Sequence, residues 1–167
     1  ILIHACFFNY KDLMKMGAVV SNFNIHDLDL RNNEFGEGGA KAIAAAFSST
    51  KVTTLELEGN QIGDEGAKSL AAALPSLKLT FFGLNNNQIG DEGAKALASA
   101  LPSSEVTFLN LHSNQIGDEG AKALAAALPR TKLTDLNLRH NQFDAEVEAT
   151  MKQVISNRDN IILTIHL

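Results

Sequence analysis

The sequence predicts an α/β solenoid, in which short parallel strands alternate with helices along a stack of similar units. Asparagines recur at a constant spacing of 27 residues, at Asn33, Asn60, Asn87, Asn114 and Asn141. Apolar and polar residues alternate before these asparagines, and apolar residues follow them at helical spacing. Because a fixed period of this length is typical of a solenoid, we expect residues 1–167 to form one repeat domain without a single central core.

The strand of each unit is visible in VTTLELEGNQI, residues 52–62. Successive side chains of a strand point to opposite faces, so Leu55 and Leu57 are predicted to face inward and Glu56 and Glu58 outward. Asn60 follows where the chain must turn, and its buried amide is expected to bond backbone groups that the turn leaves unpaired. Stacked copies of this asparagine would form a ladder of such bonds.

The helix of each unit follows in NQIGDEGAKALAAALP, residues 114–129, which recurs with one change each at residues 60–75 and 87–102. In the first copy, Asp64 is placed to cap the helix and Glu65 to lie in its first turn. Pro75 ends the helix, since proline interrupts the hydrogen-bond pattern. The inward stripe is predicted to consist of Ala67, Leu70, Ala71 and Leu74.

The unit as a whole dictates the curvature of the stack. Neighbouring strands lie about 4.8 Å apart, whereas packed helices need about 8–10 Å. The stack must therefore bend, with a concave parallel sheet and convex helices.

The pattern L-x-x-L-x-L-x-x-N-x-L, with Val or Ile accepted for Leu, resembles the leucine-rich repeat family. The full helix in each unit resembles the ribonuclease-inhibitor-like subclass of that family. This resemblance implies a right-handed βα superhelix in the shape of a horseshoe arc, with about six repeats and a final strand. Counting by 27 places Ile1 and Ile3 on the first strand, Cys6 in the asparagine position, and Leu163 and Ile165 on a seventh strand.

Residues 142–167 are predicted to form a C-terminal capping region, because the last helical segment carries polar residues on its outer side. Its inward set is Val147, Met151, Val154 and Ile155. Its polar set is Glu146, Glu148, Lys152 and Gln153.

Composition limits the partners. The net charge is −5 and no basic run is present, which argues against nucleic acid as a ligand. The single cysteine, Cys6, cannot form an internal disulfide, which suits a reducing, cytoplasmic location. No apolar run approaches the length of about 20 residues that a membrane span requires, so we expect no membrane anchor.

Little in the sequence indicates a metal site or a catalytic site. The acidic pairs of the recurrent GDEG segments lie one repeat apart rather than converging, so the sequence does not favour a calcium site. His112, His140 and His166 are close enough in the predicted register for a zinc site, although such surface histidines are more often solvated. No nucleophile and base can be paired, and we expect neither an enzyme nor a bound cofactor.

The concave positions vary from unit to unit, which makes them available for recognition. Phe81 and Phe108 occupy equivalent positions of adjacent units, with Gly83 expected to leave a depression beside them. Alternatively, both rings tuck against the strands and the nearby acids are a solvated face. The proposed partner-binding set comprises Phe81, Phe108, Asp27, Asp29, Arg31, Glu56, Glu58, Asn85, Asn110, His112, Asn137 and Arg139.

Within this set, an acidic cluster of Asp27, Asp29, Glu56 and Glu58 has Arg31 at its margin. It is expected to receive a basic stretch of a partner. The resemblance to the family implies a non-enzymatic protein–protein interaction module. The alternative is a structural element that stacks through its open ends, so we expect a monomer or weak end-to-end association.

The uniform repeats resemble bacterial or protist members of the family, which include proteins delivered into a host cell. Recent duplication or a consensus-style engineered scaffold would give the same uniformity. The sequence does not identify the protein target.

Overall fold

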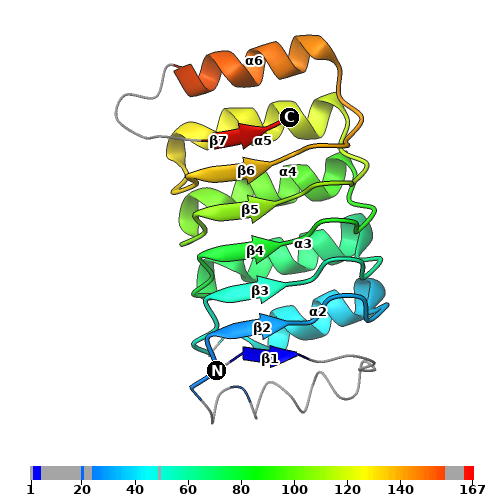
Figure 1. Ribbon diagram of the computed structural model, residues 1–167, viewed down its shortest axis with the longest axis vertical. Coiled ribbons are helices and arrows are strands. Elements are labelled where there is room, and N and C mark those ends of the chain that lie inside the picture. Colours follow the sequence, from blue (N-terminus) through cyan, green and yellow to red (C-terminus); the bar gives the residue numbers. More distant parts are fainter. Residues whose placement is uncertain (1, 5–19, 21–23, 49, 157–163) are drawn as a thin grey trace.

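The computed structural model describes residues 2–4, 20, 24–48, 50–156 and 164–167. Its centre is a seven-stranded parallel sheet whose strands follow one another in chain order, and the helices all lie on one side of that sheet (Figure 1). The predicted α/β solenoid is therefore confirmed. The strands are β1 (Leu2–His4), β2 (Asp27–Asp29), β3 (Thr54–Glu56), β4 (Phe81–Gly83), β5 (Phe108–Asn110), β6 (Asp135–Asn137) and β7 (Thr164–His166).

The helices pack against one another in sequence, each helix contacting the next along the stack. They are α2 (Gly36–Ala46), α3 (Gly63–Ala73), α4 (Asp91–Ala100), α5 (Asp118–Ala127) and α6 (Ala145–Ser156). Pro75 does not end the helical path at once, because the residues around it form a short 3₁₀ turn directly after α3. In the described part of the chain, such turns are η1 (Leu74–Ser76), η2 (Leu101–Ser103) and η3 (Leu128–Arg130).

The register of the sheet differs between the middle of the stack and its ends. Thr54 pairs with Phe81, which pairs in turn with Phe108, and these partners lie 27 residues apart. At the ends the 27-residue count fails, because Leu2 pairs with Asp27 and Thr164 with Asp135, separations of 25 and 29 residues.

The predicted positions of the first and last strands are thus wrong by two residues. Ile3 pairs with Leu28 rather than Leu30, and Ile165 with Leu136 rather than Leu138. The connecting segments of the end units differ in length from those of the central units. A slip of two residues keeps the same side chains on each face of a strand, so the apolar alternation alone could not reveal it. Ile1, Cys6 and Leu163 lie outside the described residues.

The core lies between the sheet and the helices. Leu55 and Leu57 of the strand segment are 1% and 0% exposed, as predicted, and Leu70 of α3 is completely buried against them in the same cluster. At the C-terminal end, α6 buries Val147 and Met151, while Glu146, Lys152 and Gln153 stay exposed. The side chain of Ile155 lies outside the described residues. No helix in the described part of the chain has the length and apolar character needed to cross a membrane.

Buried asparagines join neighbouring units, as predicted. The Asn87 side chain donates to the backbone oxygens of Leu57 and Asn85 at 2.8 and 3.1 Å. Its Oδ1 accepts the backbone N–H groups of Asn60 and Ile62 at 2.9 and 3.3 Å. Asn60, Asn114 and Asn141 repeat this arrangement in their own units. The amide side chains thus satisfy backbone groups that both units leave unpaired at the turn.

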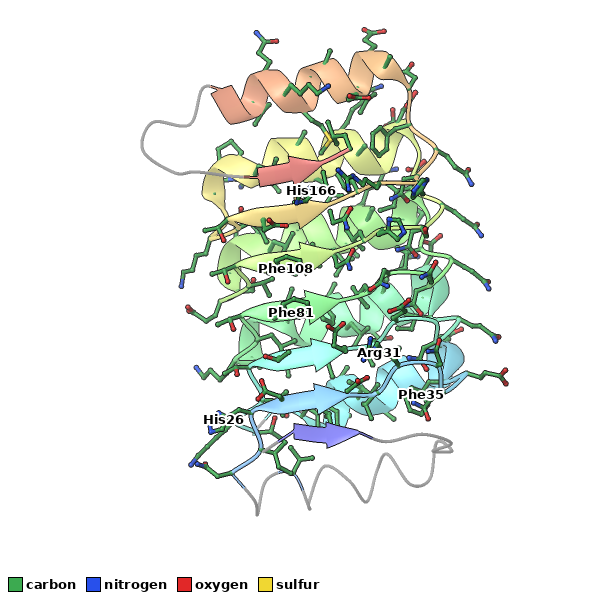
Figure 2. All side chains as sticks on the ribbon, viewed as in Figure 1. His26, Arg31, Phe35, Phe81, Phe108 and His166 are labelled. Carbon is green, nitrogen blue, oxygen red and sulfur yellow. The ribbon has the colours of Figure 1, made fainter. Side chains whose placement is uncertain are left out.

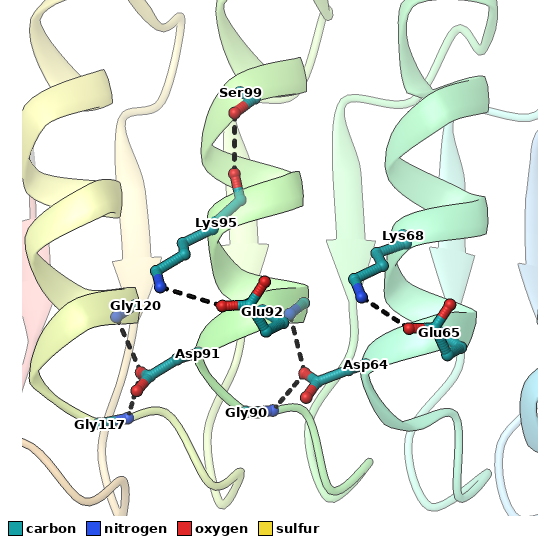
Figure 3. Close-up of polar contacts among 11 residues, drawn as sticks. Asp64, Glu65, Lys68, Gly90, Asp91, Glu92, Lys95, Ser99, Gly117 and Gly120 are labelled. Atoms are coloured by element: carbon teal, nitrogen blue, oxygen red, sulfur yellow. Dashed lines mark hydrogen bonds and ion pairs between the residues drawn. The ribbon is translucent and has the colours of Figure 1, made fainter.

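The aspartates at the helix starts act differently from the prediction. Asp64 does not cap its own helix, since α3 begins without a side-chain cap. Instead its Oδ1 accepts the backbone N–H groups of Gly90 and Gly93, at the start of α4 in the next unit, both at 2.8 Å (Figure 3). Asp91 bonds Gly117 and Gly120 of α5 in the same way. Each carboxylate therefore satisfies unpaired N–H groups of the following helix.

Candidate functional site

A pair of stacked aromatic rings lies on the open face of the sheet. Phe81 and Phe108 are register partners on β4 and β5, and their ring centroids lie 4.4 Å apart with an interplanar angle of 7° (Figure 2). Phe82, one residue along the strand, is fully buried in the core. Strand alternation therefore places Phe81 on the opposite face, where both stacked rings remain partly exposed.

The same column of side chains continues on both sides of the stack. Thr54 pairs with Phe81, and Asp135 pairs with Phe108. Asp135 lies 3.5 Å from His166 through Oδ2, while its Oδ1 is buried without a hydrogen-bond partner. Asp135 was not among the residues predicted for the site. The 27-residue step from Phe108 was the signal that could have included it.

The expected depression at Gly83 is filled from the neighbouring strand. A Cβ atom placed on Gly83 would meet Oε2 of Glu56 at 2.0 Å and Cε1 of Phe81 at 3.5 Å. Glycine therefore makes room for the Glu56 carboxylate to lie over β4, beside the edge of the Phe81 ring.

Glu56 is half-buried in this position. Burial raises the pKa of Glu56 above its ordinary value of 4.5, Arg31 opposes this rise, and Asp29 and Glu58 add to it. Within the described part of the chain, Glu56 forms no hydrogen bond or ion pair.

Arg31 does not lie at the margin of the acidic cluster but is bound within it. Its Nε and Nη2 donate to the two carboxylate oxygens of Asp29 at 2.9 and 2.7 Å. The Asp29 side chain is only 7% exposed, and this hydrogen-bonded pairing raises the pKa of Arg31. A guanidinium of the chain therefore already occupies the Asp29 carboxylate, and the expectation that the acidic cluster receives a basic partner stays a prediction.

The other predicted polar residues contact one another along the sheet. Glu58 accepts a hydrogen bond from the Asn86 side chain at 3.1 Å, and the Asn110 amide donates to Oδ1 of Asn85 at 3.2 Å. Asp27, at the start of β2, is partly exposed. These contacts link neighbouring units, and Asp27 and Glu58 both remain partly exposed.

Three of the predicted site residues also have a local structural role. The side-chain oxygens of Asp29, Asn110 and Asn137 each accept the backbone N–H of the residue two positions later. Such short-range bonds end the strand in a tight turn. In this part of the sheet, Arg139 keeps an exposed side chain.

The structure brings together two of the three histidines considered for zinc. The rings of His112 and His140 meet edge to face with centroids 4.9 Å apart, whereas His166 lies beside Asp135. Among the described residues, no group of three or more potential ligands has the geometry of a metal site.

The repeat framework identifies the family of the chain. A family model described as "Leucine Rich repeat" matches residues 21–44, 48–71, 76–98, 104–125 and 131–146, which together make up more than half of the sequence. The chain therefore belongs to the leucine-rich repeat family. Proteins of this family are generally non-enzymatic modules that bind other proteins. A search of curated protein sequences found no match.

Two solved structures illustrate the fold that this chain shares with other proteins. The actin-binding site 2 of leiomodin-1 is similar with a TM-score of 0.67 and 21% identity, over 78% of each chain. An internalin from Listeria monocytogenes is similar with a TM-score of 0.57 and 22% identity, over 92% of this chain and 36% of its own. At these identities the similarity shows the shared fold alone.

Proposed function

We propose that this chain is a non-enzymatic protein-binding module that receives its partner on the concave face of the sheet. The observation that carries the proposal is the stacked and partly exposed pair of Phe81 and Phe108. Rigid aromatic side chains surrounded by polar residues are typical of the energetic centre of an interface. The strands hold both rings in place, so little conformational freedom is lost when a partner covers them.

Membership of the family supports this proposal, because its members typically bind proteins. The name of the leiomodin-1 segment, an actin-binding site, also links this fold to protein recognition, although it says nothing about the target of this chain. We further assign the chain to the ribonuclease-inhibitor-like subclass, on the basis of the 10- and 11-residue helices in its central units. We retain a reducing, intracellular location as part of the proposal.

The test compares two double variants in affinity capture from cell lysates with mass spectrometry. Phe81→Ala with Phe108→Ala removes the stack, and Lys68→Ala with Lys95→Ala removes two partly exposed side chains from the helix side in adjacent units. We expect a partner to be captured by the wild type and the lysine variant and to be lost with the phenylalanine variant. Equal capture by the phenylalanine variant would contradict the proposal.

A stability measurement accompanies the capture, because a misfolded variant would also lose its partner. Removing the stacking interaction is expected to cost about 0.5–1.5 kcal/mol beyond the lost buried area. Phe82→Ala, which empties a core position, should cost about 3–5 kcal/mol. A loss of that larger size in the double variant would assign both rings to the core instead of to an interface.

A further inference from the structure

The apolar stack is bordered by carboxylates on the side toward β2 and β3. A Cβ atom placed on Gly83 would lie 2.0 Å from Oε2 of Glu56 and 3.5 Å from Cε1 of Phe81, so the carboxylate and the ring edge lie close together over Gly83. A partner side chain that contacts this edge of the Phe81 ring is therefore also near the Glu56 carboxylate. Apolar contact and negative charge form one continuous surface here.

Among the described residues of β2, β3 and the turns that follow them, the carboxylates of Asp27, Asp29, Glu56 and Glu58 outnumber the guanidinium of Arg31. Arg31, the basic residue among these strands, directs its Nε and Nη2 to Asp29, which leaves that pair neutral. Glu58 receives only the uncharged amide of Asn86. In the described structure, Glu56 has no hydrogen-bond or ion-pair partner at all. Glu56 and Glu58 thus have no ion-pair partner among the described residues, and Asp27 lies one strand further from the stack, on β2.

The position of Glu56 is unfavourable for the charged form of a carboxylate. Burial raises the pKa of Glu56, the positive charge of Arg31 opposes that rise in part, and the carboxylates of Asp29 and Glu58 add to it. Burying a charged group without a partner is unfavourable unless an opposite charge approaches. A cation from outside would supply that charge, and it would find the aromatic edge beside it.

We propose that the partner presents a basic segment, in which an arginine or lysine side chain pairs with Glu56 above Gly83 while an adjacent apolar side chain covers the Phe81–Phe108 stack. This inference rests on the proposed function and specifies the chemistry of the partner. Arginine suits the position better than lysine, because its planar guanidinium both stacks on aromatic rings and bonds a carboxylate through two N–H groups. Asp27 and Glu58 would attract the same segment and increase its association rate.

The experiment is a selection of random 12-residue peptides displayed on phage against the wild-type chain. We expect selected sequences in which arginine or lysine lies next to an apolar residue. The affinity of the best synthetic peptide is then measured for three variants. Glu56→Gln keeps the shape of the side chain and removes its charge, Phe81→Ala with Phe108→Ala removes the stack, and Glu65→Gln changes an exposed carboxylate on the helix side.

The expected result is a loss of affinity of about tenfold or more for Glu56→Gln, since the loss of a close charge partner in an interface has at least this effect. The phenylalanine variant should also lose binding, and Glu65→Gln should bind as the wild type does. A selection repeated with Glu56→Lys should no longer return basic peptides. Raising the salt concentration should slow association of the basic peptide with the wild type.

Two kinds of failure are distinguishable. Peptides that need Phe81 and Phe108 but are not basic, or that bind Glu56→Gln unchanged, would overturn the inference and leave the proposed function intact. Peptides that bind independently of both would contradict the inference and the proposed function together. If no peptide is enriched, the inference also fails, because a surface that receives a linear basic segment must select one.

Discussion

Asp64 Oδ1 lies 2.8 Å from the backbone nitrogen of Gly93, so a carboxylate at the start of α3 caps the first turn of α4 in the next unit. Asp91 and Gly120 stand in the same relation between α4 and α5. In a solenoid, stability is approximately the sum of the stabilities of single units and of the interfaces between neighbours. These aspartates therefore stabilise the interfaces between neighbouring units. The buried asparagines, which also bond backbone groups of the adjacent unit, do the same.

Removal of one carboxylate should weaken one interface. We expect Asp64→Ala to lower the free energy of unfolding by about 0.5–2 kcal/mol, the usual effect of losing a helix cap. The N–H groups of Gly90 and Gly93 lose their acceptor in this variant. Glu65→Ala, which removes an exposed ion pair with Lys68, should cost less than about 1 kcal/mol. Urea unfolding of both variants would decide this, and a greater loss for Glu65→Ala would refute the capping role.

The glycine that receives this cap should tolerate no side chain. A Cβ atom at position 93 would lie 2.8 Å from Asp64 Oδ1 and 2.7 Å from Cγ2 of Ile89. Gly93→Ala must therefore separate α4 from α3 or displace the cap, and we expect a loss of about 1–3 kcal/mol.

Gly38 provides the matched control in α2. No atom lies within 4 Å of a Cβ placed there, and the residue is within a helix. Gly38→Ala should stabilise the protein by about 0.5–1 kcal/mol, because alanine favours the helix more than glycine does. Thermal unfolding of the two variants should thus shift in opposite directions. Shifts of the same sign would show that helix spacing does not constrain position 93.

The asparagine ladder predicts a further large effect. Asn87→Ala leaves the backbone N–H groups of Asn60 and Ile62 without their acceptor, whereas the backbone oxygen of Leu57 keeps the Asn60 amide as a donor. Each buried group left unpaired costs about 1–3 kcal/mol, so the total should exceed the effect of losing one helix cap. Gln115→Ala, at an exposed position after the equivalent turn, should change stability by less than about 0.5 kcal/mol. Chemical denaturation that shows equal effects would indicate that water replaces the amide.

The alternation of Leu55 and Leu57 and the constant spacing of the asparagines were sufficient to predict the strands, the helices and the ladder. Both depend on contacts that the periodicity of a repeat determines directly. The same periodicity could not decide which helix Asp64 caps. The central units have the same sequence at their helix starts, so capping of its own helix and capping of the next helix fit the pattern equally well. It was also uninformative at β1 and β7, since a slip of two residues preserves the alternation of a strand.

The candidate site was predictable only in part. The 27-residue spacing was enough to place Phe81 beside Phe108, since both occupy the same position of adjacent strands. The pairing of Arg31 with Asp29 and the position of Glu56 over Gly83 depend on side-chain rotamers, which a sequence pattern does not specify. These two details decide which carboxylate can bind a partner: Arg31 already occupies Asp29, whereas Glu56 remains available.

We expect the charge of Glu56 to lower the free energy of unfolding of the free chain, although the same charge is proposed to favour binding of the partner. Burial raises its pKa in the folded protein above 4.5, so the folded state holds this proton more tightly than the unfolded chain does. For a raised carboxylate pKa, stability is highest below the unfolded value and falls as pH rises through the window up to the folded value. At neutral pH, Glu56→Gln should therefore unfold at a temperature equal to or higher than the wild type.

That difference should shrink toward zero as both proteins are acidified below pH 4.5, where the wild-type carboxylate becomes protonated in either state. The two proteins differ only at this side chain, so the difference between their melting temperatures reports on Glu56 and on its interactions with Arg31, Asp29 and Glu58. Thermal unfolding at a series of pH values measures it directly. A wild type that melts above the variant at neutral pH would show that the charge of Glu56 stabilises the free chain, which would remove the cost that an incoming cation is proposed to relieve.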